Sequence, residues 1–301
     1  MNLSTKTLAL LGLAMTNLFW ATNAVLARFV VEDIPPFTLV FGRWLLAFLL
    51  LLPFTYRDIY GNFAEIRRCW AVIIVLGLLG ITIYNSILYL AAHSTTAVNI
   101  TLVSSTLPLI TLVASVLMLK QKTSKWQMLG IAASFTGVAF IISRGDFDQL
   151  LQLNLNIGDV LIFGIACCWS IYSVILKKYP IKLPPATLLT VLITAGLPVL
   201  AVLFTTEQIL LADYAKPALN DLPIFIYIAI FPSILAYLFW TYGVKTVGPN
   251  IAALSCYLMP LLTALIAVPL LGEQLYQHHI IGGILILIGL YFGSVFKQKS
   301  A

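Results

Sequence analysis

The stretch WATNAVLARFVVEDIPP, residues 20–36, has a counterpart later in the chain, WSIYSVILKKYPIKLPP, at residues 169–185. One tryptophan and two prolines recur 149 positions apart, so that Trp20, Pro35 and Pro36 correspond to Trp169, Pro184 and Pro185. Further on, a proline and two glycines recur 152 positions apart, and Pro108, Gly130 and Gly137 correspond to Pro260, Gly282 and Gly289. These matches divide the chain into two related halves, residues 1–147 and residues 153–301.

The composition of both halves is that of a membrane protein. Of the 301 residues 61% are hydrophobic and only 9% are charged, and the mean hydropathy is +1.01, which leaves too little polar surface for a soluble globule. A bilayer core of roughly 30 Å is crossed by a helix of about 20 apolar residues. The chain has ten such segments, five in each half: 8–31, 36–56, 70–92, 96–119, 125–143, 157–177, 184–205, 222–243, 250–271 and 279–297.

The odd number of spans in each half decides the predicted architecture. A unit with five crossings begins and ends on opposite faces of the bilayer, so its copy lies upside down. The sequence therefore predicts an all-α integral membrane protein with ten transmembrane helices, arranged as two inverted five-helix repeats around a central cavity. Inverted repeats can exchange conformations, which is the physical basis of alternating access in many transporters.

The basic residues indicate how the chain is oriented. With the N-terminus in the cytoplasm, the inner loops and tails hold thirteen of the seventeen Lys and Arg residues, and the outer loops hold Arg28, Arg144 and Lys216. Basic flanks resist translocation, so both chain ends are predicted to lie in the cytoplasm, at a bacterial inner membrane. The net charge of +6 then reflects orientation and contact with anionic lipid, and we expect no nucleic-acid partner.

Residue patterns for catalysis, metals and cofactors are missing from the sequence. The four cysteines form no CxxC motif, and the three histidines include one adjacent pair, His278 and His279. There is also no phosphate-binding GxxxxGK[ST] loop, no HExxH and no GxSxG. We therefore expect no structural disulfide, no metal site and no cofactor, and a function other than that of an enzyme.

Local motifs add a family resemblance over nearly the whole chain. The strings Phe19-Trp20-Ala21, Arg43-Trp44-Leu45-Leu46-Ala47 and Leu271-Gly272-Glu273-Gln274, together with the matched prolines, resemble the EamA-type members of the drug/metabolite transporter superfamily. The resemblance implies a cavity lined chiefly by helices 1, 3, 4, 6, 8 and 9, and a role in exporting amino acids or related metabolites. The chain departs from the pattern at Lys120-Gln121-Lys122, where the second half has Gly272-Glu273-Gln274.

Arg43 is the most informative single residue, because it lies about seven residues into the second span. Its Cα is then only ~5 Å from the midpoint of the span. A guanidinium at that depth costs several kcal/mol unless it is paired or faces a watery cavity. One interpretation is a planar fork for a substrate carboxylate or phosphate. The other is a structural arginine that caps helix-end carbonyls or pairs with Glu32 or Asp33. The corresponding residue of the second half is Leu192, so either role is asymmetric.

Polar and aromatic side chains gather on the helices that the resemblance assigns to the cavity. Amides inside hydrocarbon need partners, and aromatic faces can stack on apolar or cationic substrates. The alternatives are hydrogen bonds between helices for the polar groups, and packing or interface belts for the aromatic ones. The candidate substrate-binding residues are Asn17, Trp20, Asn23, Arg43, Tyr84, Asn85, Tyr89, Asn99, Ser105, Trp169, Ser173, Tyr237, Trp240 and Tyr257.

Two prolines are candidate hinges. Pro108 and Pro260 lie near the middle of the fourth and ninth predicted spans, where a proline removes a backbone hydrogen bond and bends the helix. Passive bends are the alternative interpretation.

Acidic residues are absent from the middle of every predicted span, since Asp159 and Glu273 lie near span ends. Proton-driven carriers usually need a buried carboxylate or histidine. This favours facilitated diffusion or exchange, with His93 as the one counter-candidate.

Small residues on the fifth and tenth spans permit close packing of helices. Ala133 and Gly137 lie on one span, and Gly289 and Gly293 lie on the other. They either hold the bundle together or form a dimer face, so the sequence leaves both a monomer and a homodimer open.

The leading hypothesis is an inner-membrane exporter of small amphipathic metabolites, in particular amino acids, that works by alternating access. A first alternative is an importer or exchanger of a larger metabolite such as S-adenosylmethionine or a nucleotide, which Arg43 and the aromatic residues would also suit. A second alternative is a membrane assembly factor that transports nothing. The partners expected in each transport case are a small-molecule substrate and the lipid bilayer.

The charge distribution makes a testable prediction about topology. Reporter tags fused to the two chain ends should both report the cytoplasmic side, because thirteen basic residues flank the spans on that side. Tags that report opposite faces would contradict two odd-numbered repeats joined in one chain.

Overall fold

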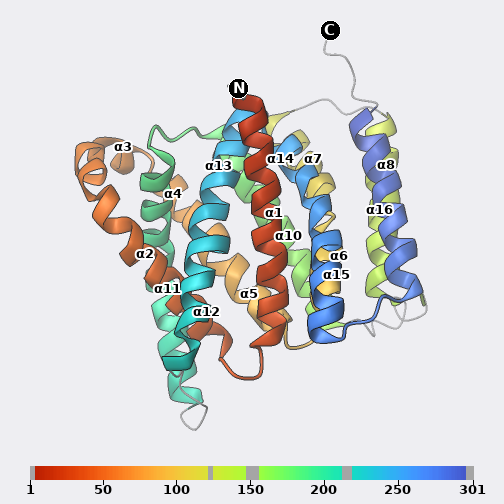
Figure 1. Cartoon of the computed structure of the whole chain (residues 1–301). Coiled ribbons are helices and arrows are strands. Elements are labelled where there is room, and N and C mark those ends of the chain that lie inside the picture. Colours follow the sequence, from red (N-terminus) through yellow and green to blue (C-terminus); the bar gives the residue numbers. More distant parts are fainter. Residues whose placement is uncertain (1–3, 121–124, 147–155, 212–218, 296–301) are drawn as a thin grey trace.

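The computed structural model describes residues 4–120, 125–146, 156–211 and 219–295, and all regular elements in these ranges are helical (Figure 1). Eight helical stretches are long and apolar enough to cross a membrane: Thr5–Phe29, Pro36–Gly61, Trp70–Ala91, Ala97–Leu119, Ile157–Lys178, Pro185–Leu210, Leu222–Val247 and Pro249–Leu271. Two further apolar helices are shorter, Met128–Ile142 and Gln277–Gly289. The expected all-helical membrane architecture is thus confirmed.

Four spans are single long helices. They are α1 (Thr5–Phe29), α2 (Pro36–Gly61), α10 (Ile157–Lys178) and α11 (Pro185–Leu210). Proline occupies the first turn of both α2 and α11, where its missing N–H would have no partner in any case. The short helix α3 (Phe63–Arg68) follows α2, and the helices at one side of the bundle are α8 (Lys125–Ile142) and α16 (Gln277–Val295).

Two of these stretches, Trp70–Ala91 and Leu222–Val247, each contain a π-helical segment. In the first, η1 (Leu78–Ile83) separates α4 (Trp70–Gly77) from α5 (Tyr84–Ala91). In the second, η3 (Ala229–Leu235) follows η2 (Leu219–Asp221) and α12 (Leu222–Ile228) and precedes α13 (Ala236–Val247). A π-segment changes the hydrogen-bond register and leaves carbonyl groups open to other partners, so such segments are frequent at functional sites.

Pro108 and Pro260 lie near the middle of the stretches Ala97–Leu119 and Pro249–Leu271, as predicted, but the helix of each stretch is interrupted just before the proline. The first stretch consists of α6 (Ala97–Ser104) and α7 (Leu107–Leu119), and the second of α14 (Pro249–Leu254), η4 (Ser255–Tyr257) and α15 (Leu258–Leu271). Pro108 and Pro260 each lie in the first turn of the second helix, because a proline fits there without breaking a hydrogen bond. Their role as hinges stays a prediction.

Helices α8 and α16 approach each other closely through glycines. A Cβ atom on Gly137 would lie 2.7 Å from the carbonyl oxygen of Gly282, and one on Gly289 would collide with the carbonyl of Gly130. The Ser134 hydroxyl also donates to the carbonyl of Ile286 at 3.2 Å. Gly137 and Gly289 therefore pack two helices of the same chain against each other.

Helices α2 and α11 lie side by side, and a carboxylate joins them at each end. At one end Glu207 accepts hydrogen bonds from the backbone N–H groups of Phe37 (2.9 Å) and Thr38 (2.6 Å) and from the Thr38 hydroxyl (2.8 Å). At the other end the Thr187 hydroxyl donates to Asp58 at 3.1 Å. The pairs Thr38–Glu207 and Asp58–Thr187 occupy corresponding positions of the two halves.

The direction of the helices defines two ends of the bundle. Helix α1 begins, and helix α16 finishes, at the end that also carries α3 (Figure 1). We call this the N-terminal end and the opposite end, where α1 finishes, the distal end. Glu207 lies at the distal end of the α2–α11 pair, because it caps the first turn of α2.

The two carboxylates should differ in their contribution to stability. Glu207 is buried and accepts three hydrogen bonds, so Glu207→Gln should lower the free energy of unfolding by about 1–3 kcal/mol. Asp58 is exposed and accepts one described hydrogen bond, so the matched control Asp58→Asn should cost less than about 1 kcal/mol. Thermal unfolding of the detergent-solubilised protein measures both, and equal losses would contradict this assignment.

Candidate functional site

Five aromatic side chains meet in the middle of the bundle, and we call them the central aromatic cluster: Trp20, Tyr84, Trp169, Tyr237 and Trp240. The Trp20 ring lies 5.1 Å from Trp169 and 5.1 Å from Trp240, and Tyr237 lies 5.2 Å from Trp169. Edge-to-face contacts at these distances stabilise a pair beyond the burial of its surface. The cluster draws on α1, α5, α10 and α13, so both halves of the chain build it.

Trp20 and Trp169 are the corresponding tryptophans of the two halves, and their rings are in direct contact at an interplanar angle of 89°. Trp169 is almost fully buried, whereas Trp20 is half-buried. The structure therefore brings these two candidates together, and together with Tyr84, Tyr237 and Trp240.

Arg43 lies beside the cluster, in the interior of the bundle, and is only 1% exposed. Its Nε donates to the Ser233 hydroxyl, its Nη2 to the Pro232 carbonyl at 3.0 Å, and its Nη1 to Tyr89 at 3.1 Å and to Asn23 at 3.4 Å. Tyr89 also donates to Asn23 at 2.8 Å. The guanidinium thus bridges α1, α2, α5 and the π-segment η3.

All the hydrogen bonds described for Arg43 go to neutral oxygens. The pairing with Glu32 or Asp33 that we considered is absent among them, whereas the capping of a backbone carbonyl is present at Pro232. The π-segment η3 makes this possible, because it leaves the Pro232 carbonyl available to both Arg43 and the indole N–H of Trp20, which is 3.3 Å away. The structure therefore adds Pro232 and Ser233 to the site, and the signal that could have indicated them is the proline in the middle of the predicted span 222–243.

The space at the centre is nearly closed. A cavity of about 20 Å³ lies between Trp20, Asn23, Ala24, Arg43, Tyr84, Asn85, Leu88, Ile100, Ser104, Tyr237 and Met259. Such a volume admits about one water molecule. Six of the predicted residues line this cavity, but the wide central cavity that the sequence predicts is not open in this conformation.

Other candidates hold helices together instead of facing the cavity. Asn17 donates to Leu13 and to the Ser255 hydroxyl at 2.8 Å. The Trp240 indole donates to Ser173, and Ser105 donates to the carbonyl of Thr101 within its own helix. Tyr257 is half-buried, and its hydroxyl has no partner among the described residues. None of Asn17, Ser105, Ser173 and Tyr257 lines the central cavity.

Asn99 belongs to a separate polar group near the distal end. Its amide donates to both oxygens of Asp159, at 3.3 and 3.1 Å, and Asp159 also accepts from Thr95. Asp159 is fully buried although it lies in the first turn of α10. The sequence placed this carboxylate correctly near a span end, but its burial depends on contacts with α6 and the loop before it, which sequence periodicity does not record.

Glu273 is a further residue whose role only the structure reveals. Its two carboxylate oxygens accept from the backbone N–H groups of Ala97 at 2.7 Å and Val98 at 3.0 Å. It therefore caps the first turn of α6, where a negative charge is stabilised by the helix dipole.

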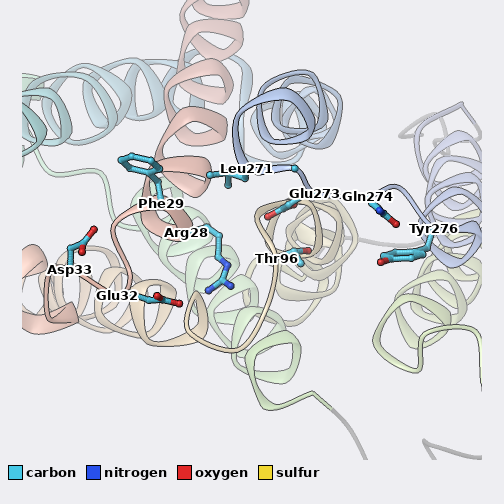
Figure 2. A pocket seen from close by; sticks show the side chains of 10 residues that line it. Arg28, Phe29, Glu32, Asp33, Thr96, Leu271, Glu273, Gln274 and Tyr276 are labelled. Atoms are coloured by element: carbon cyan, nitrogen blue, oxygen red, sulfur yellow. The ribbon is translucent and has the colours of Figure 1, made fainter.

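Two larger pockets are open at the distal end. One has a volume of about 540 Å³ and is lined by Arg28, Phe29, Glu32, Asp33, Thr96, Leu271, Gly272, Glu273, Gln274 and Tyr276 (Figure 2). The other, of about 380 Å³, is mainly apolar and includes His93 and Glu207. Burial, and secondly the charge of Arg28, lower the pKa of His93 below its usual range.

The planar, multiply bonded guanidinium of Arg43 should contribute more to the stability of the fold than its positive charge alone. Arg43→Lys keeps the charge but cannot reach Ser233, Pro232 and Tyr89 together, so it should lower the free energy of unfolding by about 2–3 kcal/mol. The control Tyr89→Phe removes one hydroxyl and should cost about 1 kcal/mol. Thermal unfolding compares them, and a lysine variant no less stable than the phenylalanine variant would contradict the bridging role.

Comparisons with known proteins agree with this architecture. The profile of the EamA-like transporter family matches residues 7–143 and 156–295. The uncharacterized transporter YyaM of Bacillus subtilis is 28% identical over 92% of this chain and 90% of its own length, and Protein PecM of Dickeya dadantii is 30% identical over 76% of this chain and 75% of its own length. A solved crystal structure matches with a TM-score of 0.68 at 20% identity, covering 96% of this chain and 97% of that chain, and so has the same fold. The chain therefore belongs to the EamA-like transporter family.

Proposed function

We propose that this protein is an inner-membrane exporter of amino acids or related small metabolites that works by alternating access. In this proposal ten transmembrane helices form two inverted five-helix repeats, residues 1–147 and 153–301, with both chain ends in the cytoplasm. The distal end of the bundle is then the outer end. The shorter helices α8 and α16 complete the count of ten spans.

Pairs of corresponding contacts support the inverted repeats. Gly137 meets Gly282 and Gly289 meets Gly130, and each contact maps onto the other when 152 is added to the residue numbers of the first half. Thr38–Glu207 and Thr187–Asp58 are related in the same way by 149 positions. Both helix pairs are antiparallel, as a two-fold axis perpendicular to the helices requires. The match of the family profile to two separate segments agrees with this symmetry.

The closed centre supports alternating access. Trp20 of one repeat lines the small central cavity and contacts Trp169 of the other repeat, and wider pockets lie at the distal end. A cavity of about 20 Å³ is far smaller than the roughly 300–1,000 Å³ typical of small-molecule sites. Transport therefore requires the two repeats to move apart around the central aromatic cluster.

The observation that carries the substrate class is the buried guanidinium of Arg43 among neutral oxygens. A buried charge is costly without a counter-charge, and a substrate carboxylate would supply one. The aromatic faces of Trp20, Tyr84 and Tyr237 border the same cavity and suit an apolar side chain. An amino acid combines these two features.

Flux measurements in proteoliposomes test the proposal. A panel of labelled amino acids should give saturable flux, and Trp20→Ala should raise the half-saturation concentration about tenfold, corresponding to about 1.4 kcal/mol of lost contact. Trp126→Ala is the matched control, because Trp126 lies on α8 away from the cavity and stacks on Phe292.

Two results would overturn the proposal. Saturable flux of S-adenosylmethionine or a nucleotide, without flux of any amino acid, would favour the larger substrate. Absence of flux for every compound, in protein that remains folded, would favour a role other than transport.

A further inference from the structure

The 540 Å³ pocket at the distal end lies close to the central cavity along the same helices. Ala24 lines the central cavity and Arg28 lines the distal pocket, one turn apart on α1. At the start of α6, Ile100 lines the central cavity and Thr96, one turn earlier, lines the distal pocket. On α15, Met259 lines the central cavity and Leu271 lines the distal pocket. The distal pocket is therefore the mouth through which the central cavity would open at this end.

The mouth carries charges of both signs. Figure 2 shows Glu32 beside the Arg28 guanidinium, with Asp33 and Glu273 farther away on opposite sides of it. The Nη1 of Arg28 donates a hydrogen bond to the Ala92 carbonyl at 3.0 Å, and no described hydrogen bond involves the other N–H groups of Arg28. Glu273 is bound to two backbone N–H groups, whereas no described hydrogen bond or ion pair engages the exposed carboxylate of Asp33. A volume of 540 Å³ is within the range of small-molecule sites.

The corresponding positions of the other repeat lack the carboxylates, and most of them carry lysine. Arg28, Phe29 and Asp33 correspond to Lys177, Lys178 and Lys182, which are all exposed near the N-terminal end, and Glu32 corresponds to Ile181. Gly272 corresponds to the exposed Lys120. Glu273 and Gln274 correspond to Gln121 and Lys122, which lie outside the described residues. None of these corresponding positions therefore has a carboxylate in the sequence.

The orientation of the chain in the membrane explains the lysines at one end of the bundle but not the carboxylates at the other. Lysines on the cytoplasmic side are required for orientation, but Asp and Glu contribute little to orientation, so they are not needed at the opposite mouth for that purpose. Carboxylates beside a pocket attract a cationic group and repel an anionic one over a distance of about one Debye length, ~10 Å. The acidic residues thus confer a charge preference on one mouth alone.

We propose that the distal pocket is a second binding site, at the outer mouth, which recognises a small zwitterion through its ammonium group. Asp33 and Glu32 attract the ammonium group, and the unused N–H groups of Arg28 face the carboxylate. The lysine-bearing inner mouth binds the carboxylate end alone. This inference rests on the proposed transport of amino acids and adds a recognition step that differs between the two sides of the membrane.

Vesicles of opposite sidedness test the proposal. Phenylalanine flux is measured in right-side-out and inside-out membrane vesicles from cells that express the wild type or the double variant Glu32→Gln/Asp33→Asn. The half-saturation concentration should rise about tenfold for phenylalanine added to the outer face and remain unchanged for phenylalanine added to the inner face. Asp146→Asn, an acidic residue of the same end that does not line the pocket, is the matched control.

Two analogues separate the charged ends of the ligand. The trimethylated, permanently cationic derivative of phenylethylamine lacks the carboxylate, and N-acetylphenylalanine lacks the ammonium group. The cationic analogue should inhibit wild-type flux from the outer face only, and this inhibition should disappear in the double variant and weaken at high salt.

The outcomes distinguish this inference from the proposed function. An unchanged outer half-saturation concentration in the double variant, or an equal change on both faces, would overturn the binding site while leaving transport intact. A change confined to the inner face would overturn the assignment of this pocket to the outer mouth. Absence of saturable flux in the wild type for the whole amino-acid panel would instead remove the proposed function.

Discussion

A buried positive charge without a described carboxylate partner is the constraint around which the centre of this protein is organised. Arg43 is 1% exposed, and its guanidinium bonds to oxygens contributed by α1, α5 and the π-segment η3. The cost of holding a charge there is several kcal/mol and is offset only if these oxygens keep their positions. The π-segment η3 presents the carbonyl of Pro232 and the hydroxyl of Ser233 to this side chain. The charge of Arg43 does not by itself account for the π-helical register, because η1 is π-helical as well although Leu192 takes the position of Arg43 in the second half.

The two halves share the contacts between their helices but differ in the side chains at the centre of the bundle. The glycine contacts of α8 with α16 and the carboxylate contacts of α2 with α11 obey the internal symmetry. The centre does not, because the position of Arg43 is taken by the buried Leu192 in the second half. Lys120 and Gly272 share a backbone conformation but differ in side chain. Each ends a helix with a left-handed backbone (φ of 53° and 66°), although only glycine adopts this conformation without strain. The backbone is thus the conserved feature of the duplication, and the side chains have diverged on it.

The sequence predicted the long-range plan better than the local detail. Span positions follow from apolar segments of about 20 residues, and most of the predicted segments match helices of the structure within a few residues. Pro108 lies near the middle of its span as predicted, but a proline is compatible with both a kink and a helix start, and only the structure shows that α7 begins just before it. The burial of Asp159 and the capping by Glu273 were missed for a related reason, since both depend on partners far away in the sequence.

The candidate site shows the same limit of sequence reasoning. Trp20, Arg43, Tyr84 and Tyr237 were identified because large aromatic or charged side chains are conspicuous inside a hydrophobic span, and these residues do line one cavity. Asn17 and Asn99 were equally conspicuous, yet they bind Ser255 and Asp159 in helix contacts away from it. A polar residue in a span must find a partner, but composition does not tell whether that partner is another helix or a ligand. Arg43 differs from these amides in the folded state because it holds a buried charge without a described counter-charge, whereas Asn17 and Asn99 are neutral and leave only the Oδ1 atom of each without a described hydrogen-bond partner.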